Sequence, residues 1–276
     1  MKNNVFCIGN GESRKNILLS NFKNKGKIYG CNALYRDFSP DVLICADPGI
    51  THEVYDSGYA FENDCYFRYW KIFNEKDYDD LKYGPHVKKD KSLIKKISKY
   101  YTNITENEKQ DSNSFALCGS SFELKKAIVE RYENDENQKE QLDYEMNCIG
   151  LHISWIKNDK VKLLSDFLSK KEVNYCAGSN SVNLACKLEN PKSVYLIGYD
   201  FNTQEYVNNI YKDTKHYAKS NKITSQKTNW YQQLKSIFEK YPDVTFYQVN
   251  EEIKIPVVWQ NIKNLKYMTY KDLLNE

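Results

Sequence analysis

The sequence predicts an α/β protein whose core is a Rossmann-like, mostly parallel sheet with a helical insert. Three apolar runs, at residues 4–9, 27–32 and 41–47, lie close together early in the chain, and a helical pattern separates the first two. This order is typical of the opening βαβ unit of a parallel sheet. The same alternation returns late in the chain. We therefore expect one α/β domain over residues 1–276, in which residues 71–147 form a helical insert or lid.

The first run, NVFCIG, predicts a buried strand that ends in GNG, residues 9–11, called the glycine turn below. A helix is expected to begin at Ser13 or Glu12. Its apolar face would carry, at helical spacing, Ile17, Leu18 and Phe22. A strand, a glycine turn and a helix start place backbone N–H groups around an anion, so the turn is a candidate phosphate site.

The later alternation adds more strands and two helices. Strands are expected at residues 148–156, 173–177, 193–198 and 244–249, the last strand of the chain. One helix should begin near Gly178 and end at Pro191, because proline cannot continue a helix. The other is amphipathic, with an apolar face of Trp230, Leu234, Ile237, Phe238 and Tyr241.

Residues 71–147 are charged, rich in tyrosine and only weakly periodic, which indicates helices over a sheet edge rather than a second core. One cluster of lysines there is opposed nearby only by Asp90; it consists of Lys88, Lys89, Lys91, Lys95, Lys96 and Lys99. The cluster is either a solvated helix face or a contact surface for a polyanionic acceptor. The net charge of +3 does not by itself indicate nucleic-acid binding.

No run approaches about 18 apolar residues, so no membrane span is expected. The start of the chain lacks the pattern of a signal peptide. None of the eight cysteines forms a C-x-x-C pair. Cys7, Cys31 and Cys45 lie in separate apolar runs, which favours buried reduced thiols over disulfides or zinc. These features predict a cytoplasmic protein.

Ligands of parallel α/β sheets bind at the carboxyl ends of the strands. The first three runs end at Gly9, Asn32 and Asp47, so these residues are candidates for one crevice. Residues 178–180, Gly-Ser-Asn, follow another apolar run, and they are suited either to capping the next helix or to hydrogen-bonding a nucleotide. The third glycine of the dinucleotide fingerprint and the lysine of a P-loop are missing, which argues against the usual NAD and ATP sites.

Acid–base chemistry near neutral pH favours a histidine. His216 lies in a polar loop beyond the strand at 193–198, with tyrosines around it. His152 lies in an apolar strand and is interpreted as structural. His52, which follows Asp47, is the second candidate base. Asp47 itself is suited to a ribose hydroxyl, a metal ion or the acceptor.

Four stretches carry a resemblance to a known family. They are GNGES (9–13), YGCNALY (29–35), AGSNSVNLACKL (177–188) and SVYLIGYDF (193–201). In this order they are similar to the bacterial cell-surface sialyltransferases. They also resemble a broader Rossmann-like group that includes motility-accessory proteins and archaeal pterin diphosphokinases. The resemblance covers residues 4–50 and 172–250 and leaves the middle of the chain unmatched.

The resemblance implies a GT-A-like variant of the Rossmann sheet and a nucleotide-sugar donor of the CMP or UDP type. The residues that it places on the donor are Gly9, Asn10, Gly11, Ser13, Asn32, Gly178, Ser179, Asn180 and Asp200. In the family, tyrosines hold the leaving phosphate and a histidine is the general base. The matching region here holds Tyr206, Tyr211, His216 and Tyr217. The resemblance thus makes Tyr211 and Tyr217 candidates for the phosphate and His216 for the base.

A metal site is the next question, because many glycosyltransferases hold Mn²⁺ and a diphosphate with an Asp-x-Asp sequence. Asp77-Tyr78-Asp79-Asp80 has this spacing, but no clear strand precedes it. Such a match arises easily by chance in a highly charged chain. We therefore favour no metal, with Mn²⁺ or Mg²⁺ as the alternative.

The sequence thus predicts a glycosyltransferase that moves a sugar from a nucleotide-activated donor to a glycan or to modified DNA. A pyrophosphate-handling diphosphokinase of the pterin type is the second hypothesis, and it would require ATP and a bound metal. The third is a non-catalytic protein that binds nucleotide sugars on a transferase scaffold. It would bind donors without hydrolysing them.

Overall fold

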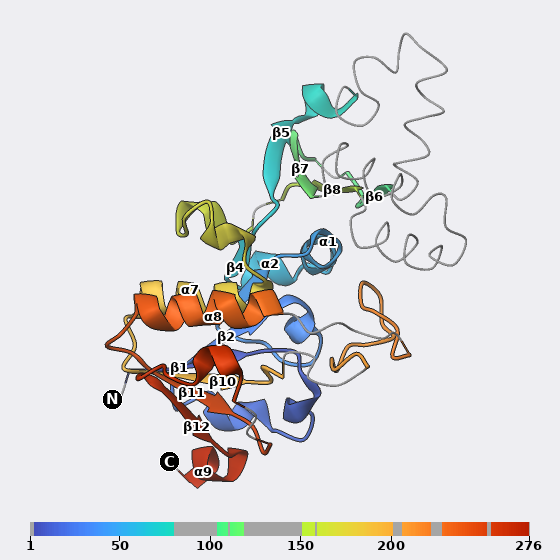
Figure 1. Ribbon diagram of the computed structural model, residues 1–276. Coiled ribbons are helices and arrows are strands. Elements are labelled where there is room, and N and C mark those ends of the chain that lie inside the picture. Colours follow the sequence, from blue (N-terminus) through green and yellow to red (C-terminus); the bar gives the residue numbers. More distant parts are fainter. Residues whose placement is uncertain are drawn as a thin grey trace, which may run out of the picture. The chain divides into compact units, whose positions relative to one another are not determined.

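The computed structural model (Figure 1) describes residues 3–79, 104–109, 111–118, 151–157, 159–200, 206–221, 228–252 and 255–275. Contacts divide the chain into two compact units, where the sequence predicted one domain. Unit 1 consists of Met1–Cys45, Asn63–Tyr66 and Lys162–Glu276. Unit 2 consists of Ala46–Glu62 and Phe67–Val161.

Unit 1 is built on a Rossmann-like, mostly parallel sheet, as predicted. The strands are β1 (Asn4–Ile8), β2 (Lys27–Cys31), β3 (Val42–Cys45), β4 (Cys65–Phe67), β9 (Val161–Leu163), β10 (Ser193–Ile197), β11 (Thr245–Val249) and β12 (Leu265–Met268). Their order is β12-β11-β10-β1-β2-β3-β4-β9. Parallel pairing runs from β12 through β1 to β3. The strand β12 follows the one that the sequence predicted to be last.

Alternating side chains of β1 pack on both faces of this sheet. Val5 and Cys7 are buried in the same core cluster as residues of α7. Phe6, between them, stacks on Phe22 at a centroid distance of 4.9 Å and on Tyr195 at 5.0 Å. The three cysteines that were predicted to be buried, Cys7, Cys31 and Cys45, are buried in strands.

Two of the helices predicted for this unit form, as α7 (Ala177–Glu189) and α8 (Thr228–Lys240), which lie side by side (Figure 1). The Cys176 sulfur caps α7 by accepting the Ser179 N–H. Asn190 ends α7 in the left-handed region with a φ of 44°. Short helices complete the unit: η1 (Glu12–Arg14), η2 (Leu19–Phe22), η3 (Asn32–Arg36), η6 (Leu164–Asp166), η7 (Glu172–Asn174), η8 (Val257–Trp259) and α9 (Tyr270–Asn275).

Two elements predicted for unit 1 are wrong. The helix expected from Ser13 or Glu12 is replaced by the 3-10 turns η1 and η2, and Leu18 between them is 65% exposed. Hydrogen bonds to Asp200 and Asn208 fix the start of this segment and override its helical spacing. The strand expected at 173–177 is instead the turn η7 followed by the first residue of α7.

Unit 2 contains the helices α1 (Pro48–Asp56) and α2 (Tyr59–Glu62) and a four-stranded sheet. Its strands, in spatial order, are β5 (Lys71–Asn74), β7 (Ser114–Cys118), β8 (Leu151–Trp155) and β6 (Ile104–Glu106). Neighbouring pairs are antiparallel except β6 with β8. The run at 148–156 therefore forms a strand, but in this sheet rather than in the parallel one.

The described part of the predicted helical insert holds β5, the turn η4 (Glu75–Asp77), β6 and β7. Most of the insert, including the lysine cluster, lies outside the described residues, so its helical character stays a prediction. Within the part of the chain that the structure describes, no helix has the length and apolar character needed to cross a membrane.

Candidate functional site

The candidate site lies in unit 1, at the carboxyl ends of three neighbouring parallel strands. The glycine turn follows β1, η3 follows β2, and Gly198 follows β10. The turn is tied to the end of β10, because Gly9 N donates to Ile197 O at 2.7 Å and Gly11 N donates to Gly198 O at 2.9 Å. A Cβ at Gly9 would overlap the Gly198 carbonyl oxygen. This close approach explains why glycine stands at position 9.

The carboxylate of Asp200 lies beside the glycine turn and binds the residue Ser13 that follows it. Ser13 N donates to Asp200 Oδ2 at 2.8 Å, and Ser13 Oγ donates to Asp200 Oδ1. Glu12 N donates to Asn208 Oδ1 at 2.8 Å. A Cβ at Gly11 would lie 2.5 Å from Asp200 Oδ2. The N–H groups of Gly9 and Gly11, which were predicted to face a phosphate, and those of Glu12 and Ser13 are therefore bonded within the chain.

Asp200 is buried among polar groups, and this burial alters its titration. Burial raises the pKa of Asp200, and the hydrogen bonds from Ser13 and Asn208 offset part of this effect. The Tyr270 hydroxyl lies 3.1 Å from Ser13 Oγ, and burial raises the pKa of Tyr270 to about 12. Asp200, Ser13 and Tyr270 thus form a buried polar cluster at the base of the site.

The loop 206–221 packs against the glycine turn. Ile210 N donates to Asn10 O at 3.0 Å, which joins the backbones of the loop and the turn. The Tyr217 hydroxyl accepts from Asn10 Nδ2 at 3.4 Å and from Ala33 N at 3.3 Å. The structure therefore brings together Asn10 and Tyr217, two predicted site residues that are 207 positions apart.

The hydroxyl of Tyr211 is engaged within the chain. It donates to Asp37 Oδ1 and accepts from Arg14 Nη2 at 2.9 Å. Arg14 is buried and also donates from Nε to Gly9 O at 2.7 Å. Burial raises the pKa of Tyr211 above its ordinary value. Tyr211 therefore holds the loop against the glycine turn through Arg14.

Arg36, at the end of η3, is a site residue that the sequence reasoning missed. Its guanidinium donates to Thr214 Oγ1 at 2.8 Å and to Lys215 O at 3.1 Å. It lies over the rings of Tyr211 and Tyr217, at 5.9 and 5.8 Å from their centroids. Its partners Thr214 and Lys215 are distant in the sequence, so no local signal pointed to it.

Backbone strain concentrates at this site. Among the described residues, four that are not glycine have a positive φ, and three of these are Asn32, at 50°, Asp213, at 66°, and His216, at 67°. The fourth, Asn190, ends α7. Non-glycine residues in this region cost free energy and cluster at functional sites. Asn32 is buried and His216 is half-buried.

The stretch 178–180 serves the start of α7. Asn180 Nδ2 donates to Val173 O at 3.2 Å and to Tyr175 O at 3.1 Å, and Ser179 bonds Cys176. The cap itself is Cys176, so residues 178–180 bond to the segment before the helix but do not supply the capping side chain. A Cβ at Gly178 would lie 3.3 Å from the Tyr199 ring, and one at Gly9 would lie 3.1 Å from it. Both glycines therefore make room for Tyr199.

The remaining candidates lie in unit 2. Asp47 is exposed just before α1. His52 Nδ1 lies 2.8 Å from Ser154 Oγ, and the buried rings of His52 and His152 stack at 5.3 Å.

Asp77 and Asp79 are at the end of η4 and just beyond it. Asp80 lies outside the described residues. No group of three or more metal-ligating side chains occurs within the described ranges.

No family model matches this chain, and no curated protein matches it. Among solved structures, this chain is similar to the sialyltransferase CstII from Campylobacter jejuni in complex with the substrate analogue CMP-3FNeuAc. The identity is 12%, the alignment covers 90% of this chain and 81% of that chain, and the TM-score is 0.41. The sialyltransferase CST-II in complex with a trisaccharide acceptor and CMP is similar at 12% identity over 89% of this chain and 80% of that chain, with a TM-score of 0.39. These scores describe a distant likeness, and the fold assignment rests on the strand order itself.

Proposed function

We propose that this chain is a glycosyltransferase that takes its sugar from a nucleotide-activated donor of the CMP or UDP type. The observation that supports this most is the contact of Asn10 with Tyr217 at the carboxyl edge of the sheet. Each residue was singled out from the sequence for a nucleotide-sugar site. The strained backbone of Asn32 and His216 at the same edge adds to this support.

In this proposal, side chains rather than the turn's backbone hold the donor. The N–H groups of residues 11–13 already donate to Gly198, Asn208 and Asp200. The Asn10 amide and the Tyr217 hydroxyl are the polar groups that meet the donor, and Arg36 lies over the Tyr217 ring. A hydroxyl and a guanidinium placed where charge develops stabilise a leaving phosphate.

His216 is the proposed general base. An acceptor hydroxyl oxygen forms a bond to the anomeric carbon of the sugar, and the bond from that carbon to the donor phosphate breaks. The nucleotide leaves with the electron pair, and the hydroxyl proton goes to the His216 imidazole. Imidazole suits this step because its ordinary pKa is close to neutral. We propose a glycan as the acceptor, with modified DNA as the alternative.

A thermal-shift screen with CMP, UDP, GDP, ADP and their sugars tests the proposal. A ligand at roughly 100 times its dissociation constant stabilises a protein by about 2.7 kcal/mol, which such a screen detects. Each donor is then incubated with the protein, and release of the nucleotide is measured. Tyr217→Phe should weaken donor binding, whereas Tyr69→Phe, the same change at an exposed tyrosine of unit 2, should not.

Absence of any nucleotide-dependent shift would contradict the proposal. Binding without release of nucleotide, with and without glycan acceptors, would instead identify a non-catalytic binding protein. Stabilisation by ATP with a divalent metal, and not by nucleotide sugars, would point to the diphosphokinase hypothesis.

A further inference from the structure

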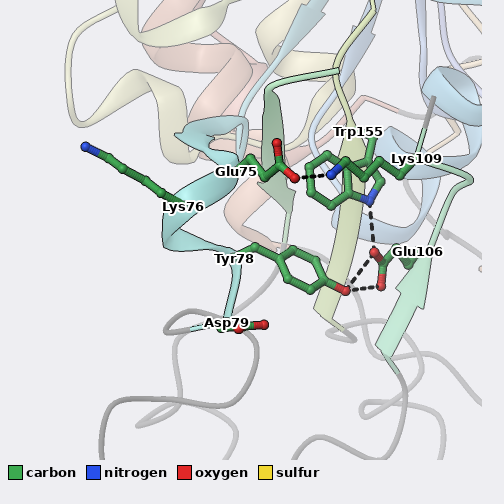
Figure 2. A pocket seen from close by; sticks show the side chains of 7 residues that line it. All are labelled: Glu75, Lys76, Tyr78, Asp79, Glu106, Lys109 and Trp155. Atoms are coloured by element: carbon green, nitrogen blue, oxygen red, sulfur yellow. Dashed lines mark hydrogen bonds and ion pairs between the residues drawn. The ribbon is translucent and has the colours of Figure 1, made fainter. Parts of the chain in front are cut away.

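Unit 2 contains a pocket of about 610 Å³ that the proposed transfer chemistry does not use (Figure 2). Its lining comes from three segments that are distant in the sequence: Glu75, Lys76, Tyr78 and Asp79 from η4 and beyond, Glu106 and Lys109 from the end of β6 and beyond, and Trp155 from β8. Its volume is in the range of small-molecule sites.

The wall of the pocket is fixed by internal hydrogen bonds (Figure 2). The Tyr78 hydroxyl donates to the Glu106 carboxylate, at 2.8 Å from Oε1 and 2.7 Å from Oε2, and Trp155 Nε1 donates to Oε1 at 2.9 Å. Trp155 is only 3% exposed, and Tyr78 stacks on it at 5.2 Å. The rings of Phe115 and Tyr78 pack edge to face, with their centroids 5.6 Å apart. Glu106 is therefore held as an oriented acceptor, as binding sites require.

The charges of the lining nearly cancel. Lys109 pairs with Glu75, and its ammonium lies 4.9 Å from the centroid of the Trp155 ring. Three carboxylates and two ammonium groups line the pocket, and the side chain of Lys76 points away from the others (Figure 2). A phosphate-bearing ligand would meet the carboxylates of Asp79 and Glu106. The lining therefore disfavours nucleotides and other polyanions.

We propose that this pocket binds a neutral saccharide. Sugar hydroxyls donate and accept hydrogen bonds, so they match a wall in which the carboxylates of Glu106 and Asp79 accept and the ammonium of Lys109 donates. The half-buried ring of Tyr78 offers an apolar surface beside these groups. The assignment goes beyond the proposed donor site and depends on none of its residues.

The test uses the full-length protein and calorimetric titration with lactose, maltotriose and chitotriose. At least one of these sugars should bind. Glu106→Gln keeps the size of the side chain but loses its charge, and the hydrogen bonds of charged groups are the strong ones, so affinity should fall about tenfold or more. Asp79→Asn, at an exposed position, should weaken binding without affecting folding. Asp111→Asn, at an exposed position of unit 2 outside the pocket, is the matched control and should bind as the wild type does.

The proposal is overturned if none of the three sugars binds, or if Glu106→Gln and Asp79→Asn both bind like the wild type. Preferential binding of spermidine over the sugars would also overturn it, because the pocket would then be a site for cations. Nucleotide-dependent thermal shifts, measured on the same variants, should be unchanged. Sugar binding without any nucleotide binding would leave the pocket assignment standing and remove the proposed function.

Discussion

At the scale of single residues, the carboxylate of Asp200 lies where the sequence predicted that a donor phosphate would bind. Its carboxylate accepts from both the backbone and the side chain of Ser13. A donor phosphate near the turn would lie close to this buried acid. The side chains of Asn10 and Tyr217, which project from the turn and the loop, are therefore better candidates for the donor than the backbone.

Gly11→Ala tests this arrangement. The added methyl would lie 2.5 Å from Asp200 Oδ2, and such overpacking costs about 1–3 kcal/mol. The free energy of unfolding, measured in urea, should fall by that amount. In the Asp200→Ala background the same change should cost less, since the two sites are coupled. Equal costs in both backgrounds would contradict this account.

His216→Asn tests the general base. Asparagine tolerates the left-handed backbone found at this position, so the variant should fold. Loss of a general base costs about 10²–10⁴-fold in rate. Transfer should fall by that factor while donor affinity changes only a few-fold. If transfer proceeds at the normal rate, His52 and Asp47 are the next candidates to replace.

The sequence located part of the site and missed the rest for a physical reason. Asn10, Ser13 and Asn32 follow strand ends, where local pattern predicts ligand contacts. Arg14 and Arg36 carry no such local signal. Their roles come from contacts with Tyr211, Thr214 and Lys215, which are far away in the sequence.

At the scale of elements, the loop 206–221 is fastened to the glycine turn and to η3 at several points. Lys212 pairs with Glu12 at 2.8 Å, and Arg36 bonds Thr214 and Lys215. The ion pair of Lys212 with Glu12 and the hydrogen bond from Arg36 to Thr214 are both partly exposed. Single substitutions can remove these surface contacts without damaging the core, whereas the contact of Tyr211 with Arg14 is buried.

Arg36→Ala should loosen this loop. We expect faster hydrogen exchange at the amides of Ile210, Thr214 and Tyr217, which all donate hydrogen bonds in the structure, and little change in β1. Lys25→Ala, which removes an exposed cation of the same unit, should leave loop exchange unchanged. Unaltered exchange in Arg36→Ala would show that the other contacts suffice to hold the loop.

The contact between η7 and α8 gives a prediction about pH. Burial alone would raise the pKa of Glu172, but hydrogen bonds from Lys240 and Ser169 outweigh it and lower the pKa to about 2. The ordinary value is 4.5, so as pH falls the unfolded chain binds this proton first. The stabilisation by Glu172 is therefore present above pH 4.5 and is lost as pH falls toward 2.

Glu172→Gln should accordingly lower the melting temperature at neutral pH. The difference from the wild type should shrink as pH falls from 4.5 toward 2. Glu239→Gln removes a pair with Lys235 on the surface of α8, and exposed pairs of this kind contribute little. This control should differ little from the wild type at any pH. A pH-independent effect of Glu172→Gln would contradict the ion-pair account.

Elements with strong local patterns were predictable, and elements set by distant partners were not. β1, β10 and α8 have clear apolar periodicity, and they form where expected. The segment after the glycine turn has helical spacing, but its backbone is fixed by Asp200 and Asn208, nearly two hundred residues away. The strand β12 was missed because its alternation is short.

At the scale of the whole molecule, the strand order places β1 and β10 in the interior of the large sheet and β12 and β9 at its edges. Interior strands of a parallel sheet are paired on both sides, so their amides open only with much of the sheet. Native-state hydrogen exchange should therefore be slowest in β1 and β10 and faster in β12. Exchange as slow in β12 as in β1 would contradict this expectation.

The large sheet also determines how the rest of the chain can vary. The strand β4 ends at Phe67, β9 begins at Val161, and the two are neighbours at one edge of that sheet. Adjacent strands are separated by about 4.8 Å, and the entropy of closing a loop depends only weakly on its length. Changes of length within residues 68–160 are therefore compatible with the strand order of the sheet, provided that the contacts of α1 with β7 and β8 are kept. Such changes would leave the glycine turn and its hydrogen-bond partners as they are, because all of these residues lie outside residues 68–160.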